Sequence, residues 1–238
     1  LISIIIPAYN EEEVLGELKK RLQKVSERLS GYLFEFIIVE NGSVDKSFRK
    51  LVNIRHDDNR FKILQLSRNF GCDGAIAAGL QFAKGRAAII MNADLQDPPE
   101  IIPRFIKQWK AGFEIVYGVI TKRKGVSLAR KLFSRLFYLI IHNLTNKAIP
   151  ENASDFRLMD KKVYKVVNRM NEGNKFLRGI IAWTGFKQIG ISYTRPPRFA
   201  GKSKVNFITA FKIATNGIFS FSYFPLRIAT ALGLILAL

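Results

Sequence analysis

The chain has 238 residues, of which 38 are Lys or Arg and 19 are Asp or Glu, so its formal net charge is +19 at pH 7. Hydrophobic residues make up 48% of it and aromatic residues 12%, which excludes a disordered chain because so much apolar surface can be buried. The single cysteine, Cys72, excludes a disulfide scaffold, and the presence of only His56 and His142 disfavours a Cys/His zinc site. The positive charge favours a polyanionic partner, such as nucleic acid, anionic lipid or a phosphorylated substrate.

Strand-like and helical patterns alternate over the first 120 residues. Short runs rich in β-branched or aromatic residues predict buried strands at 2–6, 34–39, 61–66, 87–91 and 115–119. Apolar residues at helical spacing predict helices between them, at 11–29, 47–54, 73–83 and 98–109. This alternation predicts an α/β domain with a parallel sheet that is covered by helices on both faces.

The second half carries two amphipathic stretches with many aromatic residues, at 128–144 and 207–224. Their aromatics and the basic flanks of the first favour helices that lie in a membrane interface, with a core helix as the alternative. Residues 228–238 carry no charge but are fewer than the about 20 residues of a bilayer span, so we interpret them as the start of a transmembrane helix. We therefore expect one domain at 1–204, including an amphipathic helix at about 128–145, and a membrane segment at 205–238.

Polar residues follow three of the predicted strands, at 7–10, 40–43 and 92–100. Because binding sites in parallel sheets lie beyond the carboxyl ends of the strands, we expect these segments to share one rim. Asp94 suits a Mg²⁺ or Mn²⁺ that bridges a diphosphate, since Mg²⁺ takes only one or two protein carboxylates beside water and phosphate oxygens. Asp97 precedes Pro98 and Pro99 and is expected to cap the helix that follows.

Five segments resemble motifs of the family 2 glycosyltransferases. In chain order they are IIIPAYNEE at 4–12, SRNFG at 67–71, NADLQDPPE at 92–100, SDFRL at 154–158 and RFAGKSK at 198–204. The pattern is most similar to the branch with polyprenyl-phosphate acceptors, of the dolichol-phosphate mannose synthase and bacterial undecaprenyl-phosphate glucosyltransferase type. The resemblance, over roughly residues 1–210, implies the GT-A nucleotide-diphospho-sugar transferase fold with a Rossmann-like, mainly parallel sheet.

The resemblance also implies a role for each residue that matches a motif. Nucleotide-sugar binding is implied for Pro7, Ala8, Tyr9, Glu11, Val39, Asn41, Asn92, Ala93 and Asp94. Metal binding is implied for Asp94, Asn92 and Gln96, phosphate binding for Arg198 and Lys204, and catalysis for Asp94, Asp155 and Arg157. From the residues alone, Asp155 has two other interpretations, as a cap for a helix near Lys161 or as an ion-pair partner of Arg157.

Three positions depart from the family pattern. The family usually has Asp where this chain has Asn41 and Asn92, and commonly Arg where it has Ile120. Asn92 keeps an acceptor oxygen but loses a charge, which should weaken metal binding. Asn41 can still hydrogen-bond a base, although it presents donors as well. Ile120 removes a phosphate contact, with three basic residues close by at 122–124.

The resemblance implies an inverting displacement at the anomeric carbon of a nucleotide sugar, with a UDP-linked hexose as the expected donor and a polyprenyl phosphate as the acceptor. A phosphate monoester, with a second pKa of about 6, is mostly dianionic at neutral pH and needs no strong general base. The expected cofactor is Mg²⁺ or Mn²⁺, held at Asp94 while Arg198 and Lys204 contact phosphates.

Further expected partners are an anionic membrane surface and a second copy of the chain, at the cell membrane with the catalytic domain on its cytoplasmic face. Two alternatives remain open: a family 2 enzyme with a glycan hydroxyl as acceptor, and a non-catalytic relative that binds nucleotide sugar or lipid. Nucleic-acid binding ranks last, because only the charge suggests it and no recognition motif is present.

Overall fold

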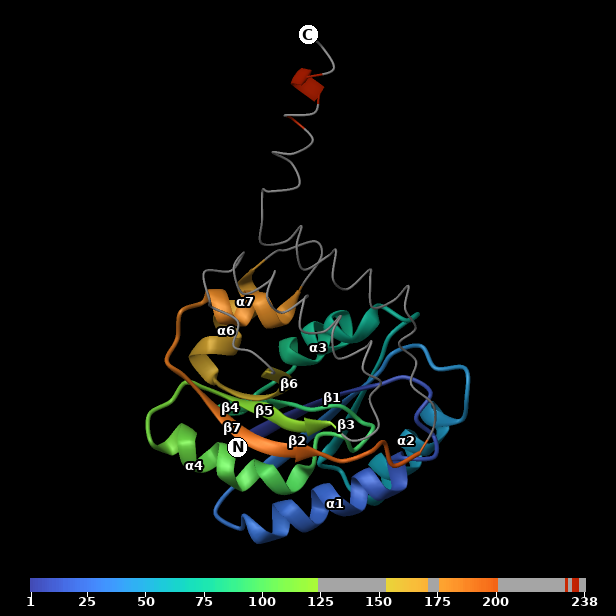
Figure 1. Ribbon diagram of the computed structural model, residues 1–238. Coiled ribbons are helices and arrows are strands. Elements are labelled where there is room, and N and C mark those ends of the chain that lie inside the picture. Colours follow the sequence, from blue (N-terminus) through green and yellow to red (C-terminus); the bar gives the residue numbers. More distant parts are fainter. Residues whose placement is uncertain (124–152, 171–175, 201–229, 231–232, 236–238) are drawn as a thin grey trace.

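The computed structural model describes residues 1–123, 153–170, 176–200, 230 and 233–235 (Figure 1). The strands are β1 (Ile2–Ala8), β2 (Phe34–Glu40), β3 (Phe61–Gln65), β4 (Ala87–Ile90), β5 (Ile115–Arg123), β6 (Ala153–Asp160) and β7 (Gln188–Arg195). The helices are α1 (Leu15–Arg28), α2 (Ser47–Asp57), α3 (Gly71–Gln81), α4 (Ile102–Lys110), α6 (Lys161–Arg169) and α7 (Leu177–Trp183), and a 3₁₀ turn, η1 (Pro99–Ile101), precedes α4.

The strands form one seven-stranded sheet in the order β3-β2-β1-β4-β6-β5-β7. β1 pairs in parallel with β2 and β4, β2 with β3, and β5 with β7. β6 runs antiparallel to both β4 and β5, so the sheet is mainly parallel, as predicted. Because β6 is reversed, its first residues lie at the carboxyl end of β4, where Arg157 is paired with Ile90.

Alternate side chains of the strands enter two different cores, which explains why the strands are apolar at nearly every position. In β1, Ile2, Ile4 and Ile6 pack with α1, α2 and α4, whereas Ile5 packs with α3, α6 and α7. Figure 1 shows these two groups of helices on opposite faces of the sheet. The predicted covering of both faces is confirmed.

The predicted elements of the first 123 residues are all present, with shifted ends. The first helix begins at Leu15 instead of Glu11, because the Glu11 carbonyl accepts from the N–H groups of Val14 and Leu15 in a turn that precedes it. β6, α7 and β7 were not predicted. The two amphipathic stretches and most of 228–238 lie outside the described residues. Among the residues that are described, no helix has the length and apolar character needed to cross a bilayer.

Two glycines lie within helices, and replacing each by alanine separates the effect of packing on stability from the effect of helix propensity. A Cβ at Gly79 in α3 would lie 2.6 Å from Ile5 Cγ2 and 2.8 Å from Val39 Cγ2, whereas a Cβ at Gly16 in α1 would meet no atom within 4 Å. We expect Gly79→Ala to lower the free energy of unfolding by about 1–3 kcal/mol through overpacking. Gly16→Ala should raise it by about 0.5–1 kcal/mol. Urea denaturation of both variants measures this, and a stabilised Gly79→Ala would contradict the close contact of α3 with the sheet.

Candidate active site

Polar segments from three strands meet at one edge of the sheet, as predicted. The backbone N–H of Asn41 donates to the Ala8 carbonyl (2.8 Å), and that of Asn10 donates to Ser43 Oγ (3.0 Å). We call this edge the rim; it comprises residues 7–10, 40–43 and 92–97. Of the predicted nucleotide-binding residues, Ala8, Val39, Asn41, Ala93 and Asp94 are buried, and Pro7, Tyr9, Glu11 and Asn92 are partly exposed.

The loop that follows β4, residues 92–97, is called the acidic loop here. The backbone N–H of Gln96 donates to Asp94 Oδ1 (3.1 Å), which fixes the carboxylate against its own turn. That turn requires Leu95 to adopt a positive φ of 58° although its side chain is buried in the core. A leucine in the left-handed region is strained by about 1–2 kcal/mol, so packing of the side chain maintains an unfavourable backbone at this loop.

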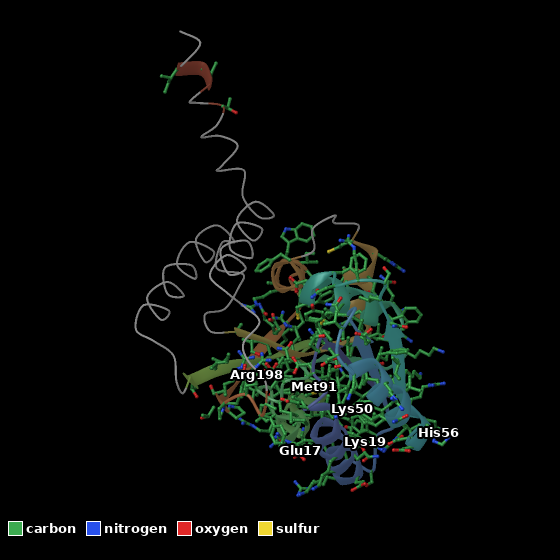
Figure 2. The ribbon with its side chains drawn as sticks, turned by 90° about the vertical axis from the view of Figure 1, so that its right-hand side faces the viewer. Glu17, Lys19, Lys50, His56, Met91 and Arg198 are labelled. Atoms are coloured by element: carbon green, nitrogen blue, oxygen red, sulfur yellow. The ribbon has the colours of Figure 1, made fainter. Side chains whose placement is uncertain are left out.

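Arg198 lies over Asp94. Its Nη2 is 2.9 Å from Asp94 Oδ2 and its Nη1 is 3.4 Å from Glu11 Oε1, so one guanidinium joins the acidic loop to the segment after β1. In the view of Figure 2, Arg198 and His56 are labelled on opposite sides of the molecule. Arg198 is thus placed among the predicted nucleotide-binding residues. The other predicted phosphate ligand, Lys204, lies outside the described residues.

Asp97 does not cap a helix. The residue before η1 is Pro98, with no side-chain cap, and the fully buried Asp97 carboxylate points into the sheet edge. It accepts from Tyr193 Oη (2.7 Å) and Ser154 Oγ (3.5 Å), and Arg195 Nη2 lies 3.7 Å from it. Burial raises the pKa of Asp97 above the usual value, although Arg195 and the Tyr193 hydroxyl oppose the shift. The capping prediction is wrong because this carboxylate accepts its hydrogen bonds from β6, β7 and Asn92 instead of from the helix terminus.

Asn92 donates to Asp97 Oδ2 twice, from its side-chain Nδ2 (3.0 Å) and from its backbone N–H (3.4 Å). Its Oδ1 faces the thiol of Cys72, with 3.8 Å between oxygen and sulfur. An aspartate at position 92 could not donate to Asp97, and it would place a second carboxyl group against the Asp97 carboxylate, which is unfavourable. The contact with Asp97 therefore favours an amide at position 92, where the family pattern has Asp.

The side chain of Asn41 also donates hydrogen bonds that a carboxylate could not make. Its Nδ2 donates to Asn69 Oδ1 (3.2 Å) and to the Gly71 carbonyl (3.1 Å), and its Oδ1 accepts from the backbone N–H of Phe70 (3.0 Å). A carboxylate cannot donate, so Asp would leave two of these acceptors without their partner. The third departure, Ile120, is 6% exposed and belongs to the hydrophobic core, where a guanidinium would be costly.

Asp155, near the start of β6, lies between two arginines. Arg178 donates to its Oδ1 from Nε (3.1 Å) and Nη2 (2.8 Å), and Arg157 Nη2 lies 3.8 Å from the same oxygen. Withdrawal from water acts to raise the pKa of Asp155, but the two arginines outweigh it and hold the pKa below the usual value. The predicted ion pair with Arg157 is present, while Asp160 rather than Asp155 caps α6.

Four residues of this site were missed from the sequence: Asp73, Arg178, Tyr193 and Arg195. Tyr193 and Arg195 continue the alternate positions of Ile189 and Ile191 in β7, and this period of two before Pro196 was a usable signal for a strand that ends at the rim. Asp73 and Arg178 gave no signal, since only the packing of α3 and α7 brings them to Asp155. Burial and the charge of Asp155 raise the pKa of Asp73 to about 7.

The acidic loop offers oxygen ligands for a divalent cation. The carboxylate of Asp94 and the amides of Asn92 and Gln96 come from one turn, although the Gln96 Nε2 donates to the Pro196 carbonyl (3.5 Å) and the Asn92 amide contacts Asp97. Among the described residues no group of three or more His, Cys, Asp or Glu side chains is placed to hold a metal. This donor set fits a cation such as Mg²⁺ or Mn²⁺ that takes most of its ligands from a diphosphate and water.

The order of the strands and an acidic loop after the fourth one define a GT-A fold. The structure of glucosyl-3-phosphoglycerate synthase from Mycobacterium tuberculosis, in complex with Mn²⁺, UDP and glucosyl-3-phosphoglycerate, aligns with a TM-score of 0.59 at 15% identity, over 90% of this chain and 76% of that one. Mannosyltransferase PcManGT from Pyrobaculum calidifontis, in complex with GDP-Man and Mn²⁺, aligns with a TM-score of 0.57 at 17% identity, over 83% of this chain and 58% of that one.

Sequence comparisons give the family. The model of glycosyl transferase family 2 matches residues 3–168. An uncharacterized glycosyltransferase of Synechocystis sp. is 40% identical over 237 residues, which cover 100% of this chain and 74% of the relative. The prophage bactoprenol glucosyl transferase homolog of Escherichia coli (strain K12) is 36% identical over 236 residues, 99% of this chain and 77% of the relative. The chain belongs to glycosyl transferase family 2, as the motifs predicted.

A pair of Tyr→Phe variants tests the role of buried Asp97. Tyr193→Phe leaves a buried carboxylate without its shortest donor, whereas Tyr164→Phe removes a hydrogen bond of 2.6 Å to the neutral Gly85 carbonyl. Because charged acceptors are costlier to leave unpaired, we expect a loss of about 2–3 kcal/mol for Tyr193→Phe and about 1 kcal/mol for Tyr164→Phe. Chemical denaturation measures both, and equal losses would argue against a charged Asp97.

Proposed function

We propose that this glycosyltransferase moves a hexose from a UDP-sugar to a polyprenyl phosphate, with inversion at the anomeric carbon. The name of the E. coli relative specifies bactoprenol and glucose, and this chain is 36% identical to it. The M. tuberculosis structure contains UDP and Mn²⁺ in the same fold. These names support the acceptor and the donor, and the chemistry at Asp155 favours a phosphate acceptor over a hydroxyl.

The observation that carries the proposal is the double arginine contact of Asp155. A sugar hydroxyl acceptor needs a general base whose pKa lies near the working pH. Arg178 and Arg157 hold the pKa of Asp155 below the usual value, which makes this carboxylate a weak base. A lipid phosphate is already a nucleophilic anion, and the two guanidinium groups supply charge-assisted hydrogen bonds of the kind that phosphate oxygens accept. The arrangement therefore favours a phosphate acceptor.

The reaction needs no net proton transfer. An oxygen of the acceptor phosphate forms a bond to the anomeric carbon, while the bond from that carbon to the nucleoside diphosphate breaks and the diphosphate leaves with the electron pair. Arg178 and Arg157 orient the attacking phosphate, and Arg198 stabilises charge that develops on the leaving group. Asp94, with Asn92 and Gln96, would hold a divalent cation, which neutralises diphosphate charge when bound.

We further propose that the protein acts at the cell membrane, with its catalytic domain on the cytoplasmic face, and that it associates with a second copy of the chain. A net charge of +19 suits an anionic membrane surface, and a polyprenyl acceptor resides in the bilayer. Flotation with vesicles of anionic lipid tests the surface contact. Protein that stays at the bottom of the gradient both with and without vesicles would contradict this contact.

The decisive experiment follows the release of nucleoside diphosphate from a panel of UDP- and GDP-sugars with Mg²⁺ or Mn²⁺, with and without a short polyprenyl phosphate in detergent. Release that requires the lipid phosphate supports the proposal and identifies the sugar. Release with a glycan acceptor instead would establish the hydroxyl-acceptor alternative. Nucleotide-sugar binding without any release would establish a non-catalytic relative.

The pH dependence of kcat/KM for the lipid phosphate separates acceptor from enzyme groups. Asp155 has a lowered pKa and stays ionised throughout, so the rate should rise with the second ionisation of the acceptor near about pH 6 and then level off. A phosphonate analogue, which has a higher second pKa, should move the midpoint upward. Asp73, with its pKa of about 7, is the competing group, and Asp73→Asn is the control. Loss of the transition in Asp73→Asn would contradict this assignment.

A charge-matched pair of variants tests Arg178. Arg178→Gln removes the donors to Asp155. Arg104→Gln removes the same charge from an exposed residue, whose side chain donates to the Ser192 carbonyl within the described part of the chain. We expect Arg178→Gln to lower kcat/KM for the lipid phosphate by about 10–100-fold, the value of a charge-assisted hydrogen bond, with little change in KM for the sugar nucleotide. Arg104→Gln should change neither. Equal effects of the two variants would rule out a specific role for Arg178.

A further inference from the structure

The segment from the last residue of β7 to the third residue after it lies across the acidic loop. Arg195 contacts Asp97 (3.7 Å), the Pro196 carbonyl accepts from Gln96 Nε2 (3.5 Å), and Arg198 contacts Asp94 (2.9 Å). We call residues 195–198 the strap. Two consecutive prolines, Pro196 and Pro197, fix φ along the strap and restrict its backbone.

Arg198 compensates the charge of Asp94. The Asp94 side chain is only 9% exposed, and a carboxylate withdrawn from water to this degree requires a nearby cation. Arg198 is that cation, and it contacts the same oxygen-rich turn that offers ligands to a divalent ion. Its second contact, to Glu11 at 3.4 Å, holds it there from the side of β1. A divalent ion that binds Asp94 must therefore displace Arg198.

We propose that Arg198 competes with the divalent cation for Asp94, so that the cation binds together with the nucleoside diphosphate and poorly without it. A cation alone would have to break the Arg198–Asp94 ion pair and then face the displaced guanidinium at close range. A diphosphate that enters with the cation offers Arg198 a new anion, and the ion pair is exchanged instead of lost. The inference rests on the proposed function, because the diphosphate of the donor is the anion that accepts Arg198.

The consequence is positive coupling between two ligands. By linkage, if Arg198 makes cation binding weak without nucleotide, the nucleotide raises cation affinity and the cation raises nucleotide affinity by the same factor. The strap thereby prevents the cation from being trapped by the acidic loop alone. Removal of Arg198 should strengthen the binding of the free cation while it weakens the use of the donor, and these opposite signs distinguish competition from a general loss of structure.

Electron paramagnetic resonance of free Mn²⁺ tests this without turnover. Mn²⁺ is titrated into the wild-type chain and into Arg198→Gln, each with and without UDP. We expect Arg198→Gln to bind Mn²⁺ alone about tenfold more tightly than the wild type, as for the loss of one charge-assisted pair. The factor by which UDP raises the Mn²⁺ affinity should fall by a similar amount.

Arg104→Gln is the matched control, since it removes the same charge from an exposed residue whose side chain bonds the Ser192 carbonyl and not the acidic loop. It should change the Mn²⁺ affinity by less than about threefold, as expected for a screened charge. Arg198→Lys keeps the charge but cannot span Asp94 and Glu11 together, so an intermediate affinity is expected, and this variant serves where Arg198→Gln does not fold.

Three results would overturn the inference. An unchanged or weaker Mn²⁺ affinity in both Arg198 variants, with UDP-promoted binding intact in the wild type, contradicts the competition and leaves the proposed function standing. An equal gain in Arg104→Gln shows a non-specific charge effect. A wild-type chain in which UDP fails to promote Mn²⁺ binding contradicts both the inference and the proposed donor.

Discussion

The site depends on one buried carboxylate. Asp97 has no exposed surface, and a charge withdrawn from water persists only when donors surround it. These donors come from the acidic loop itself and from β6 and β7, two strands that follow more than 50 residues later in the chain. Satisfying Asp97 therefore requires the second half of the fold to close against the loop after β4. The same closure positions everything else at the rim.

The reversed direction of β6 turns this closure into a reaction centre. A parallel strand at this position would bring its last residues to the rim, whereas an antiparallel strand brings its first ones. Asp155 and Arg157 are placed beside the acidic loop for this reason, two and four residues into the strand. α7 then adds Arg178 from above the sheet. The acids and the arginines of the site thus come from elements with no common sequence pattern, joined by topology.

The sequence predicted the first half of the molecule well and the second half poorly, for a physical reason. Strands such as β1 and β2 are buried on both faces and read as uninterrupted apolar runs, which is a strong local signal. β6 carries Ser154, Asp155 and Arg157 between its apolar residues because it forms the site, so its pattern is obscured by its function. The rim itself was predictable, since the carboxyl ends of parallel strands must meet.

Individual roles were harder to predict than positions. Asp97 resembled a helix cap because only its neighbours Pro98 and Pro99 are visible in the sequence, whereas its partners lie far along the chain. Asn41 and Asn92 looked like losses of charge against the family pattern. In the folded chain both amides donate hydrogen bonds that a carboxylate could not, to Gly71 and to Asp97. A departure from a motif is informative only when the partners of the side chain are known.

The charged groups of the site are balanced before any ligand binds. Asp94 is paired with Arg198, Asp97 with Arg195, and Asp155 with Arg178 and Arg157. A donor diphosphate or an acceptor phosphate therefore gains no unpaired arginine at these positions; each must exchange an existing ion pair for a new one. Exchange costs less than desolvation of a bare charge, and it makes the affinity for one ligand depend on what the others have already displaced. In such a site, discrimination among anions comes from the geometry of exchange more than from net charge.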